Sequence, residues 1–178
     1  MKLLVGLGNP GKDYEKTRHN FGRLVITMLA SELKLKFNDS SKLQASLSET
    51  KGQGIGEKTI LAYPKNFMNN SGTTVKLLSD YFKILPEDIY IIHDDLDLEV
   101  GDYRIQFDRG PAGHNGIISI IDKFGTQSFH RIRLGIGHPQ DLTPVEKYVL
   151  MPFLPEERII ISSTVKKLIE EIRQLINL

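Results

Sequence analysis

The chain has 178 residues with 23 Lys and Arg against 22 Asp and Glu, and its net charge of +1 excludes nucleic-acid binding through bulk positive charge. The lack of cysteine excludes disulfides, thiolate metal sites and a cysteine nucleophile, and predicts a cytoplasmic location. The length predicts one domain over residues 1–178, and because no apolar stretch approaches the length of a membrane span, no membrane partner is expected.

Strands and helices are predicted to alternate in the first half of the chain. Residues 2–7 form an apolar run, stopped by Gly-Asn-Pro-Gly, that predicts a buried strand. From Asn20 onward, apolar residues recur at helical spacing and predict a helix. Alternation over residues 43–47 and the run at 58–63, which follows a Gly-rich turn, predict a strand hairpin. Ser71 is the expected N-cap of a second helix.

The second half of the chain continues this alternation. Strands are predicted at 88–93, 102–107 and 129–137, and helices at 114–125 and from Pro155 onward. Strands and helices in this order, interrupted by hairpins, predict an α/β fold. We expect a single domain in which helices flank both faces of a mixed, twisted β-sheet.

Three glycines near the start have the spacing of a dinucleotide-binding turn. Gly6, Gly8 and Gly11 spell G-x-G-x-x-G. In a true motif the helix begins inside the glycine sequence, and an acidic residue about twenty positions later binds the ribose. Here the helix is expected only from Asn20, and Pro10 removes a main-chain amide from the turn. The sequence therefore argues against a dinucleotide, and no cofactor is expected.

Polar residues follow the first predicted strand in a long loop. The loop carries Asn9, Tyr14 and His19, and loops at the carboxyl ends of strands often hold functional residues in α/β proteins. From spacing alone, Asn9 is better explained as a turn former and His19 as a residue at a helix start. Further motifs are needed to decide between these interpretations.

Three such motifs occur later in the chain. The sequence HDDLD at 93–97 could bind a divalent metal, orient a histidine, or simply end a strand in solvent. The sequence GHNG at 113–116 places Asn115 at a helix start, where it either caps the helix or helps to stabilise an anion. The asparagines of NFMNNSG at 66–72 are either turn formers or neutral hydrogen-bonding groups for a peptide-like ligand.

The sequence contains none of the common motifs of nucleophilic or zinc hydrolases. It lacks G-x-S-x-G, S-x-x-K and H-E-x-x-H. For a hydrolase, the simplest chemistry that the residues allow is a water activated by histidine, with amide donors around the carbonyl. Basic residues are in excess over 103–140, so this segment either faces phosphates or forms a solvated surface.

Taken together, five motifs resemble the bacterial peptidyl-tRNA hydrolase family in the same order along nearly the whole chain. They are GLGNPGKDYEKTRHNFG, FMNNSG, HDDLDLEVGDYRI, GHNG and HRIRLGIGHP. The resemblance implies a monomeric esterase without metal or cofactor. It also implies cleavage of the ester between an N-blocked peptide and the 3′ end of tRNA, which recycles tRNA from aborted translation. The implied partner is peptidyl-tRNA, bound at its acceptor end.

The resemblance also implies a role for individual residues. His19 is the implied catalytic base, Asp94 sustains its basic form, and Asn9 distinguishes blocked from free aminoacyl ends. The implied substrate and tRNA contacts are Tyr14, Phe67, Asn69, Asn115 and Arg133, the last on a tRNA phosphate.

One segment departs from the family pattern. Gln106 and Asp108 stand where positive charge is expected, which leaves open whether Arg104 or Arg109 assists Arg133. Two other functions are compatible with parts of the sequence: a noncatalytic RNA-binding module with the same fold, and a metal-dependent phosphoesterase built on HDDLD. Residues 137–150 are expected to form a lid.

Overall fold

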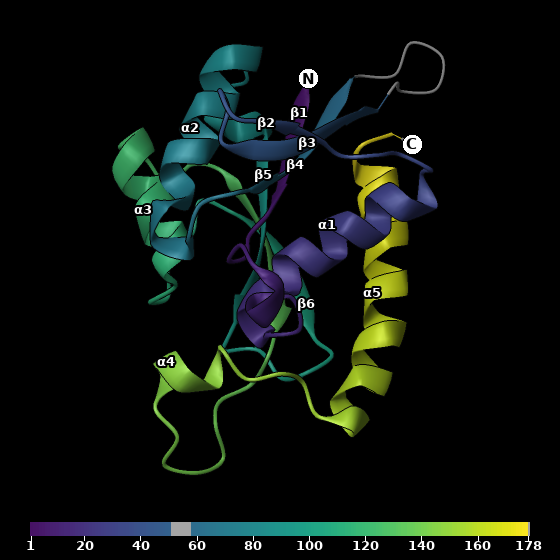
Figure 1. Ribbon diagram of the computed structural model, residues 1–178, viewed down its shortest axis with the longest axis vertical. Helices are drawn as coiled ribbons and strands as arrows, with labels where there is room; N and C mark the ends of the chain where they lie inside the picture. Colours follow the sequence, from purple (N-terminus) through teal and green to yellow (C-terminus); the bar gives the residue numbers. More distant parts are fainter. Residues whose placement is uncertain (51–57, 178) are drawn as a thin grey trace.

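Seven strands form one mixed sheet in the order β2-β3-β4-β1-β5-β7-β6 in the computed structural model, which describes residues 1–50 and 58–177 (Figure 1). The strands are β1 (Lys2–Gly6), β2 (Asn38–Ser40), β3 (Ala45–Thr50), β4 (Thr59–Pro64), β5 (Ile89–Asp95), β6 (Tyr103–Phe107) and β7 (His130–Gly135). The inner strands β4, β1, β5 and β7 are parallel, whereas β2, β3 and β6 join antiparallel at the two edges.

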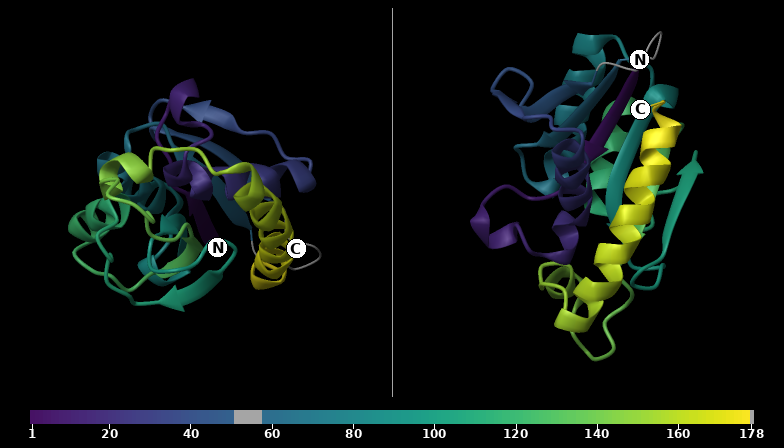
Figure 2. Two further views of the ribbon diagram at one scale, coloured as in Figure 1. Left: turned by 90° about the horizontal axis from the view of Figure 1, so that it is seen from below. Right: turned by 90° about the vertical axis from the view of Figure 1, so that its right-hand side faces the viewer.

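Helices cover both faces of the sheet (Figure 2). The helices are α1 (Phe21–Glu32), α2 (Ser71–Phe82), α3 (Asn115–Phe124), α4 (Val145–Tyr148) and α5 (Pro155–Leu175). Side chains alternate across each strand, so Leu4 and Ile92 pack in the core with α1 and α5. Val5 and Ile91 pack on the opposite face, in the core with α2 and α3. The predicted α/β fold, with a mixed sheet between helices, is confirmed.

The parallel strands bring their carboxyl ends to one edge of the sheet. β1 ends before the loop that carries Asn9, and β5 ends at Asp94 and Asp95. Every residue of β5 is buried, because the strand lies between two parallel neighbours and is covered on both faces. In such sheets, ligands bind outside the carboxyl ends of the strands. This edge is therefore where a site is expected.

Two glycines allow α1 to pack directly against the sheet. A Cβ at Gly22 would lie 2.0 Å from the carbonyl oxygen of Ile92, and one at Gly6 would lie 2.4 Å from the carbonyl oxygen of Gly22. Gly6 in the G-x-G-x-x-G pattern thus serves helix packing. After Gly11 the chain forms only short 3-10 turns, at Lys12–Tyr14 and Arg18–Asn20, and the α-helix α1 begins at Phe21, so no α-helix starts inside the glycine motif.

Some predictions for local structure need correction. Ser71 is the first residue of α2 and not its N-cap, which is Asn70. The Ser71 hydroxyl instead donates to the carbonyl oxygen of Met68 at 2.8 Å. The edge strand β2 was not predicted, and the expected turn between β3 and β4 lies outside the described residues. Within the described part of the chain, no helix combines the length and the apolar character needed to cross a membrane.

Candidate active site

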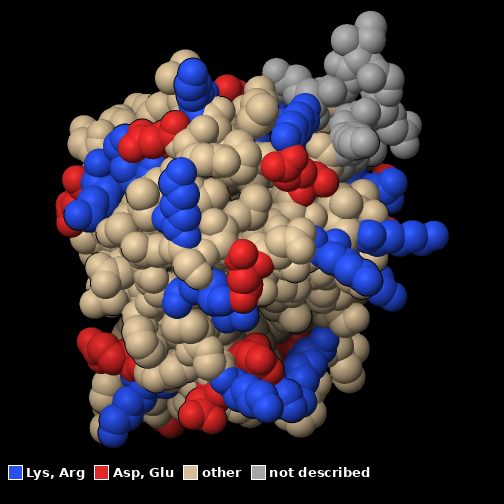
Figure 3. Space-filling view, turned by 45° about the horizontal axis from the view of Figure 1, so that its top comes forward, with Lys and Arg blue, Asp and Glu red and all other residues tan. Residues whose placement is uncertain are grey.

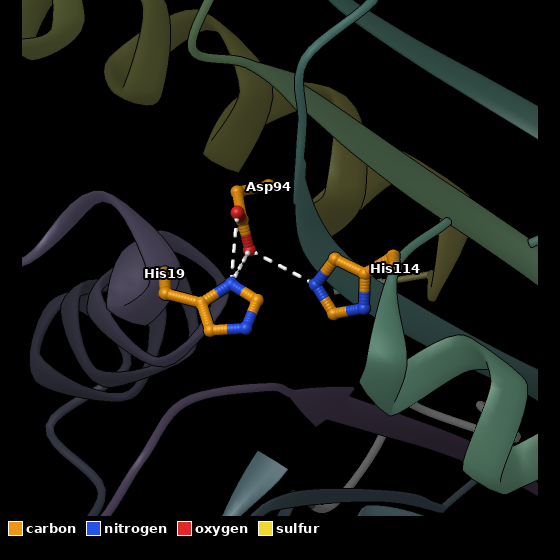
Figure 4. Close-up of side chains that lie close together, drawn as sticks. All are labelled: His19, Asp94 and His114. Carbon is orange, nitrogen blue, oxygen red and sulfur yellow. Dashed lines mark hydrogen bonds and ion pairs between the residues drawn. The ribbon is translucent and has the colours of Figure 1, made fainter. Parts of the chain in front are cut away.

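Two histidines and a carboxylate meet at the carboxyl edge of the sheet. His19 comes from the 3-10 turn before α1, Asp94 from the end of β5, and His114 precedes α3 (Figure 4). Nδ1 of His19 lies 3.0 and 2.9 Å from the two carboxylate oxygens of Asp94. Nε2 of His114 lies 3.0 Å from Oδ1 of the same carboxylate. The predicted pairing of His19 and Asp94 is therefore present, with a second histidine on the same acid.

Burial and charge act on the two partners in opposite ways. Burial alone would lower the pKa of His19, but the Asp94 carboxylate outweighs it by charge and by its hydrogen bond, so the pKa is raised above 6.5. Burial would likewise raise the pKa of Asp94, but the two histidines hold it well below its usual range. Asp94 is thus an anion at neutral pH, and it stabilises positive charge on His19.

The sequence motifs do not mark His114 as part of the cluster. It is the N-cap of α3, and its Nδ1 accepts hydrogen bonds from the main-chain N–H groups of Gly116 at 3.1 Å and Ile117 at 3.3 Å. The signal available in the sequence was the GHNG motif, which had drawn attention to Asn115 alone. Only the fold brings α3 against the end of β5.

The three acids of HDDLD point to different partners. Asp95 accepts a hydrogen bond from Nε of Arg133 at 2.7 Å, while the half-exposed Asp97 lies 3.5 Å from His138. His19, Asp94 and His114 are residue types that bind metals, and one ligand atom from each lies within 4.8 Å of the others. The nitrogen–oxygen separations of 2.9 to 3.0 Å are nevertheless those of direct hydrogen bonds. The arrangement therefore fits a hydrogen-bonded cluster better than a metal centre.

Asn9 is held by both its main chain and its side chain. Asn20 accepts from the Asn9 main-chain N–H at 2.8 Å and donates to the Asn9 carbonyl oxygen at 3.0 Å. Oδ1 of Asn9 accepts from the main-chain N–H of Met68 at 2.8 Å. Because that main-chain group can only donate, the oxygen of the Asn9 carboxamide is fixed, and its NH₂ group is the end available to a ligand.

A cavity at this edge joins most of the predicted site residues. It is lined by Asn9, His19, Phe67, Met68, Asn69, Asn115, Glu146, Val149 and Leu150. A second cavity, which shares His19, is lined by the Asp94 and His114 side. Tyr14 lies outside these linings, but its ring meets that of Phe67 edge-on with centroids 6.0 Å apart. The structure thus brings together Asn9, His19, Phe67, Asn69 and Asn115, with Tyr14 in ring contact with Phe67.

Arg133 is not among the cavity residues. It is 4% exposed, donates to Asp95, and its Nη1 donates to the side-chain oxygen of Gln106 at 2.8 Å. Gln106, noted in the sequence for standing where positive charge was expected, is therefore a direct partner of Arg133. A phosphate contact by Arg133 would require its guanidinium to leave a buried ion pair. Arg104 and Arg109, by contrast, are exposed.

The expected lid contains α4 and is fastened to the turn that carries His19. The main-chain N–H groups of Arg18 and His19 donate to the carbonyl oxygens of Met151 at 3.0 Å and Val149 at 2.8 Å. The Arg18 guanidinium lies over the rings of Tyr148 and Phe153, and it pairs with Glu157 at 2.8 Å. The wall of the cavity at Val149 is therefore fixed relative to His19.

Charge on the surface is mixed in the view of Figure 3, where Lys and Arg are interspersed with Asp and Glu. This face agrees with the near-neutral composition. Among the described residues in this view, Lys and Arg form no broad positive surface of the kind that binds nucleic acid without a local site.

A histidine held by a buried carboxylate, beside a cavity lined with amide side chains, is typical of a hydrolase. Comparison with known proteins agrees with this class. A family model described as peptidyl-tRNA hydrolase matches residues 3–178. A peptidyl-tRNA hydrolase from Aquifex aeolicus is 47% identical over 168 residues, which cover 94% of this chain and 85% of the relative. Another, from Oceanobacillus iheyensis, is 46% identical over 167 residues, which cover 94% of this chain and 88% of the relative.

The fold has a counterpart among solved structures. The crystal structure of peptidyl-tRNA hydrolase from Acinetobacter baumannii matches with a TM-score of 0.92 and 32% identity, over 99% of this chain and 88% of that chain. The chain belongs to the peptidyl-tRNA hydrolase family. The resemblance inferred from five motifs, and the prediction of a hydrolase that acts on ester bonds, are confirmed.

Proposed function

We propose that the protein hydrolyses the ester between an N-blocked peptide and the 3′ end of tRNA, and so recycles tRNA from aborted translation. The observation that carries this proposal is the buried Asp94 carboxylate 2.9 Å from Nδ1 of His19, beside a cavity lined by Asn9, Asn69 and Asn115. Family membership supports the substrate class, because the matched relatives are peptidyl-tRNA hydrolases.

In the proposed reaction His19 is the general base. Asp94 accepts a hydrogen bond from the Nδ1–H group of His19, which leaves Nε2 of the neutral ring free to take a proton from water. The water oxygen then attacks the ester carbonyl carbon, and a tetrahedral oxyanion forms. When this intermediate collapses, the bond from carbon to the tRNA 3′ oxygen breaks. The protonated His19 returns its proton to that oxygen, giving the tRNA hydroxyl and a peptide carboxylic acid, which releases its proton to solvent.

Amide side chains around the cavity supply hydrogen-bond donors for these reaction steps. The NH₂ groups of Asn9, Asn69 and Asn115 can donate to carbonyl oxygens of the peptide or to the oxyanion. A neutral donor at Asn9 suits a blocked substrate, since it offers no carboxylate to the ammonium group of a free aminoacyl end. Phe67, supported by Tyr14, provides an exposed ring at the mouth of the cavity for the substrate.

The proposed tRNA contact is formed by arginines next to the site. Arg109 precedes the loop residues Ala112 and Gly113, which line the cavity beside His114. Arg104 lies on β6, directly across from Arg133 on β7. Both Arg104 and Arg109 are exposed, so we propose that they contact the tRNA phosphates directly. Arg133, which is buried next to them, adds positive charge to the same region. A monomeric state and a cytoplasmic location remain predictions from the family resemblance and from composition.

The direct test is release of free tRNA from an N-acetyl-aminoacyl-tRNA. We expect His19→Asn to lower turnover by about 10²- to 10⁴-fold, the usual contribution of a general base, with substrate binding retained. His138→Gln is the matched control, because His138 is exposed and lies outside both cavities. A folded His19→Asn protein with normal turnover would refute the proposed mechanism, and failure of the wild type to release tRNA would refute the function.

A further inference from the structure

His114 is bound at both ring nitrogens, and its two partners differ in kind. Nδ1 accepts from the main-chain N–H groups of Gly116 and Ile117 at the start of α3. A main-chain N–H can only donate, so Nδ1 carries no proton and the single proton of the neutral ring is on Nε2. Nε2 is the atom 3.0 Å from Oδ1 of Asp94. The helix start therefore fixes which tautomer faces the acid.

We propose that His114 is a positioning residue for His19: its Nε2–H group, fixed by the N-terminus of α3, holds the Asp94 carboxylate in the orientation that faces His19. Asp94 is attached to β5, and the one Nδ1–H group of His19 lies near both carboxylate oxygens, so by itself it does not select one orientation of the carboxylate. The second donor, from another element, removes that freedom. This inference rests on the proposed role of His19 as base.

The same bond tunes the basicity of His19. Asp94 shares its charge between two donors, so it attracts the proton of His19 less strongly than an acid bonded to His19 alone. The charged and titratable groups around the pair are Asp94, Asp95 and His93 from β5, His114 before α3, and Glu146 from α4. Of these, His114 is the neutral donor that contacts the carboxylate directly.

The tautomer also bears on metal binding. A metal on Nε2 of His114 would displace the proton that Nε2 donates to Asp94 in a hydrogen bond. Nδ1 is not available either, because it accepts hydrogen bonds from two main-chain N–H groups. The ring would then have to be an imidazolate or give up both bonds to α3. His114 is therefore built to donate to an acid and is poorly arranged to bind a cation.

Two substitutions separate the donor from the helix cap. His114→Gln keeps an N–H at the reach of Nε2 and loses the acceptor for α3, whereas His114→Asn keeps an acceptor at the position of Nδ1 and falls short of Asp94. Neither adds a charge. Kinetics on N-acetyl-aminoacyl-tRNA and thermal unfolding, measured on both variants, thus report the donor and the cap independently.

We expect kcat to depend on the N–H donor to Asp94 and not on the acceptor that caps α3. His114→Asn should lose about tenfold in kcat with little change in KM, because a hydrogen bond to a charged group is lost without a substrate contact. In His114→Asn the acid limb of the pH profile of kcat/KM should move to higher pH. Without the bond to His114, Asp94 attracts the proton of His19 more strongly and raises the pKa of His19 further. His114→Gln should keep most of kcat and the wild-type limb, yet melt earlier than His114→Asn. Equal kcat and pH profiles in the two variants would overturn the proposal.

Nitrogen NMR of the wild-type protein tests the tautomer without any substitution. We expect the His114 signals to show that Nε2 is protonated and Nδ1 is unprotonated. A protonated Nδ1 would overturn the proposal. The His19→Asn experiment separates the two levels of inference. Loss of activity there, together with unchanged kinetics in His114→Asn, removes the role of His114 and leaves the proposed function intact.

Discussion

Nδ1 of His19 lies 2.9 Å from Oδ2 of Asp94, although 75 residues separate the two in the sequence. The acid stands at the end of a fully buried central strand, so its position is fixed by the sheet. The histidine ring has its second nitrogen turned away from the acid (Figure 4). This pairing sets both the orientation and the basicity of the proposed base.

We expect Asp94→Asn to lower kcat by on the order of 10²-fold, because an amide neither orients the ring reliably nor stabilises the protonated imidazole. The sign of the pH effect follows from the pKa of His19, which burial lowers and Asp94 raises above 6.5. Without the charge of Asp94 only the effect of burial remains, so the pKa falls and the acid limb moves to lower pH.

The pH profile of kcat/KM for Asp94→Asn, compared with wild type, measures this shift. Asp97→Asn is the matched control, since Asp97 is about half exposed and makes no contact with His19. An acid limb that stays in place or moves to higher pH would show that Asp94 does not govern His19.

Asn9 offers a second test, because Met68 fixes the orientation of its carboxamide. Asn9→Asp keeps an oxygen for the Met68 N–H and replaces the NH₂ group by a second oxygen. The aspartate would attract the ammonium group of an unblocked aminoacyl end and repel a developing oxyanion. We expect slower cleavage of the blocked ester and a smaller ratio between the rates on blocked and unblocked esters.

The ratio is measured on N-acetyl-aminoacyl-tRNA and on the same aminoacyl-tRNA without the acetyl group. Asn66→Asp serves as control, because Asn66 lies in the same amide-rich segment but bonds to Gln44 and Thr74, away from the cavity. If Asn9→Asp leaves the ratio unchanged, Asn9 acts only in the turn.

Much of the fold could be predicted because its signals are local. The apolar run of β5 and the helical periodicity of α5 indicate buried elements from spacing alone. Ser71 was misassigned because Asn70 and Ser71 are both typical caps, and only main-chain angles decide between them. The edge strand β2 has three polar residues and no apolar alternation, so nothing in its sequence marks it.

The site was predictable only where a motif reaches the cavity. His19, Asp94 and Asn9 lie in motifs typical of the family, and the structure brings them to one edge. His114 was missed because its contact with Asp94 depends on how α3 docks beside β5. For Arg133, the family resemblance implies a phosphate contact, which stays a prediction, and the structure adds that β5 and β6 surround the side chain with Asp95 and Gln106. Burial of this kind is set by strand order, which the motifs do not reveal.

The arginines of the basic segment are expected to divide into two kinds. Arg133→Ala breaks a buried ion pair and leaves Asp95 without its partner, which should cost about 3–5 kcal/mol of stability. Arg104→Ala and Arg109→Ala should leave stability unchanged, because both side chains are exposed. If they bind phosphates, each should raise KM and reduce the salt slope of tRNA binding by about one unit.

Thermal unfolding and binding titrations at several salt concentrations distinguish these outcomes. Lys83→Ala, at the distant end of α2, is the control for loss of a single exposed charge. Arg133 would be a direct phosphate contact if Arg133→Ala kept its melting temperature and lost more of the salt slope than Arg104→Ala or Arg109→Ala.

His93 makes the stability of the protein sensitive to acid. The side chain is buried, its Nδ1 donates to the main-chain oxygen of Asp94 at 2.7 Å, and Nε2 is buried without a partner among the described residues. Burial lowers the pKa of His93 to about 3 from an ordinary value of 6.5. Between these values the unfolded chain binds a proton that the folded protein does not.

The stability that neutral His93 contributes is therefore complete above pH 6.5 and is lost as pH falls toward 3. Over that window one such group gives a slope of about 1.4 kcal/mol per pH unit in the free energy of unfolding. His19 does not add to the slope there, since its raised pKa matters only above 6.5. His130, whose pKa is lowered by partial burial, adds a background common to every variant.

We expect His93→Leu to flatten the pH dependence of unfolding between pH 6.5 and 4.5, although the loss of its bond to Asp94 lowers stability at every pH. Urea unfolding at closely spaced pH values gives the slope for the variant, the wild type and the control His138→Gln, which replaces an exposed histidine. The control should keep the wild-type slope. If His93→Leu also keeps it, His93 takes up its proton in the folded protein as readily as in the unfolded chain, and the acid sensitivity arises elsewhere.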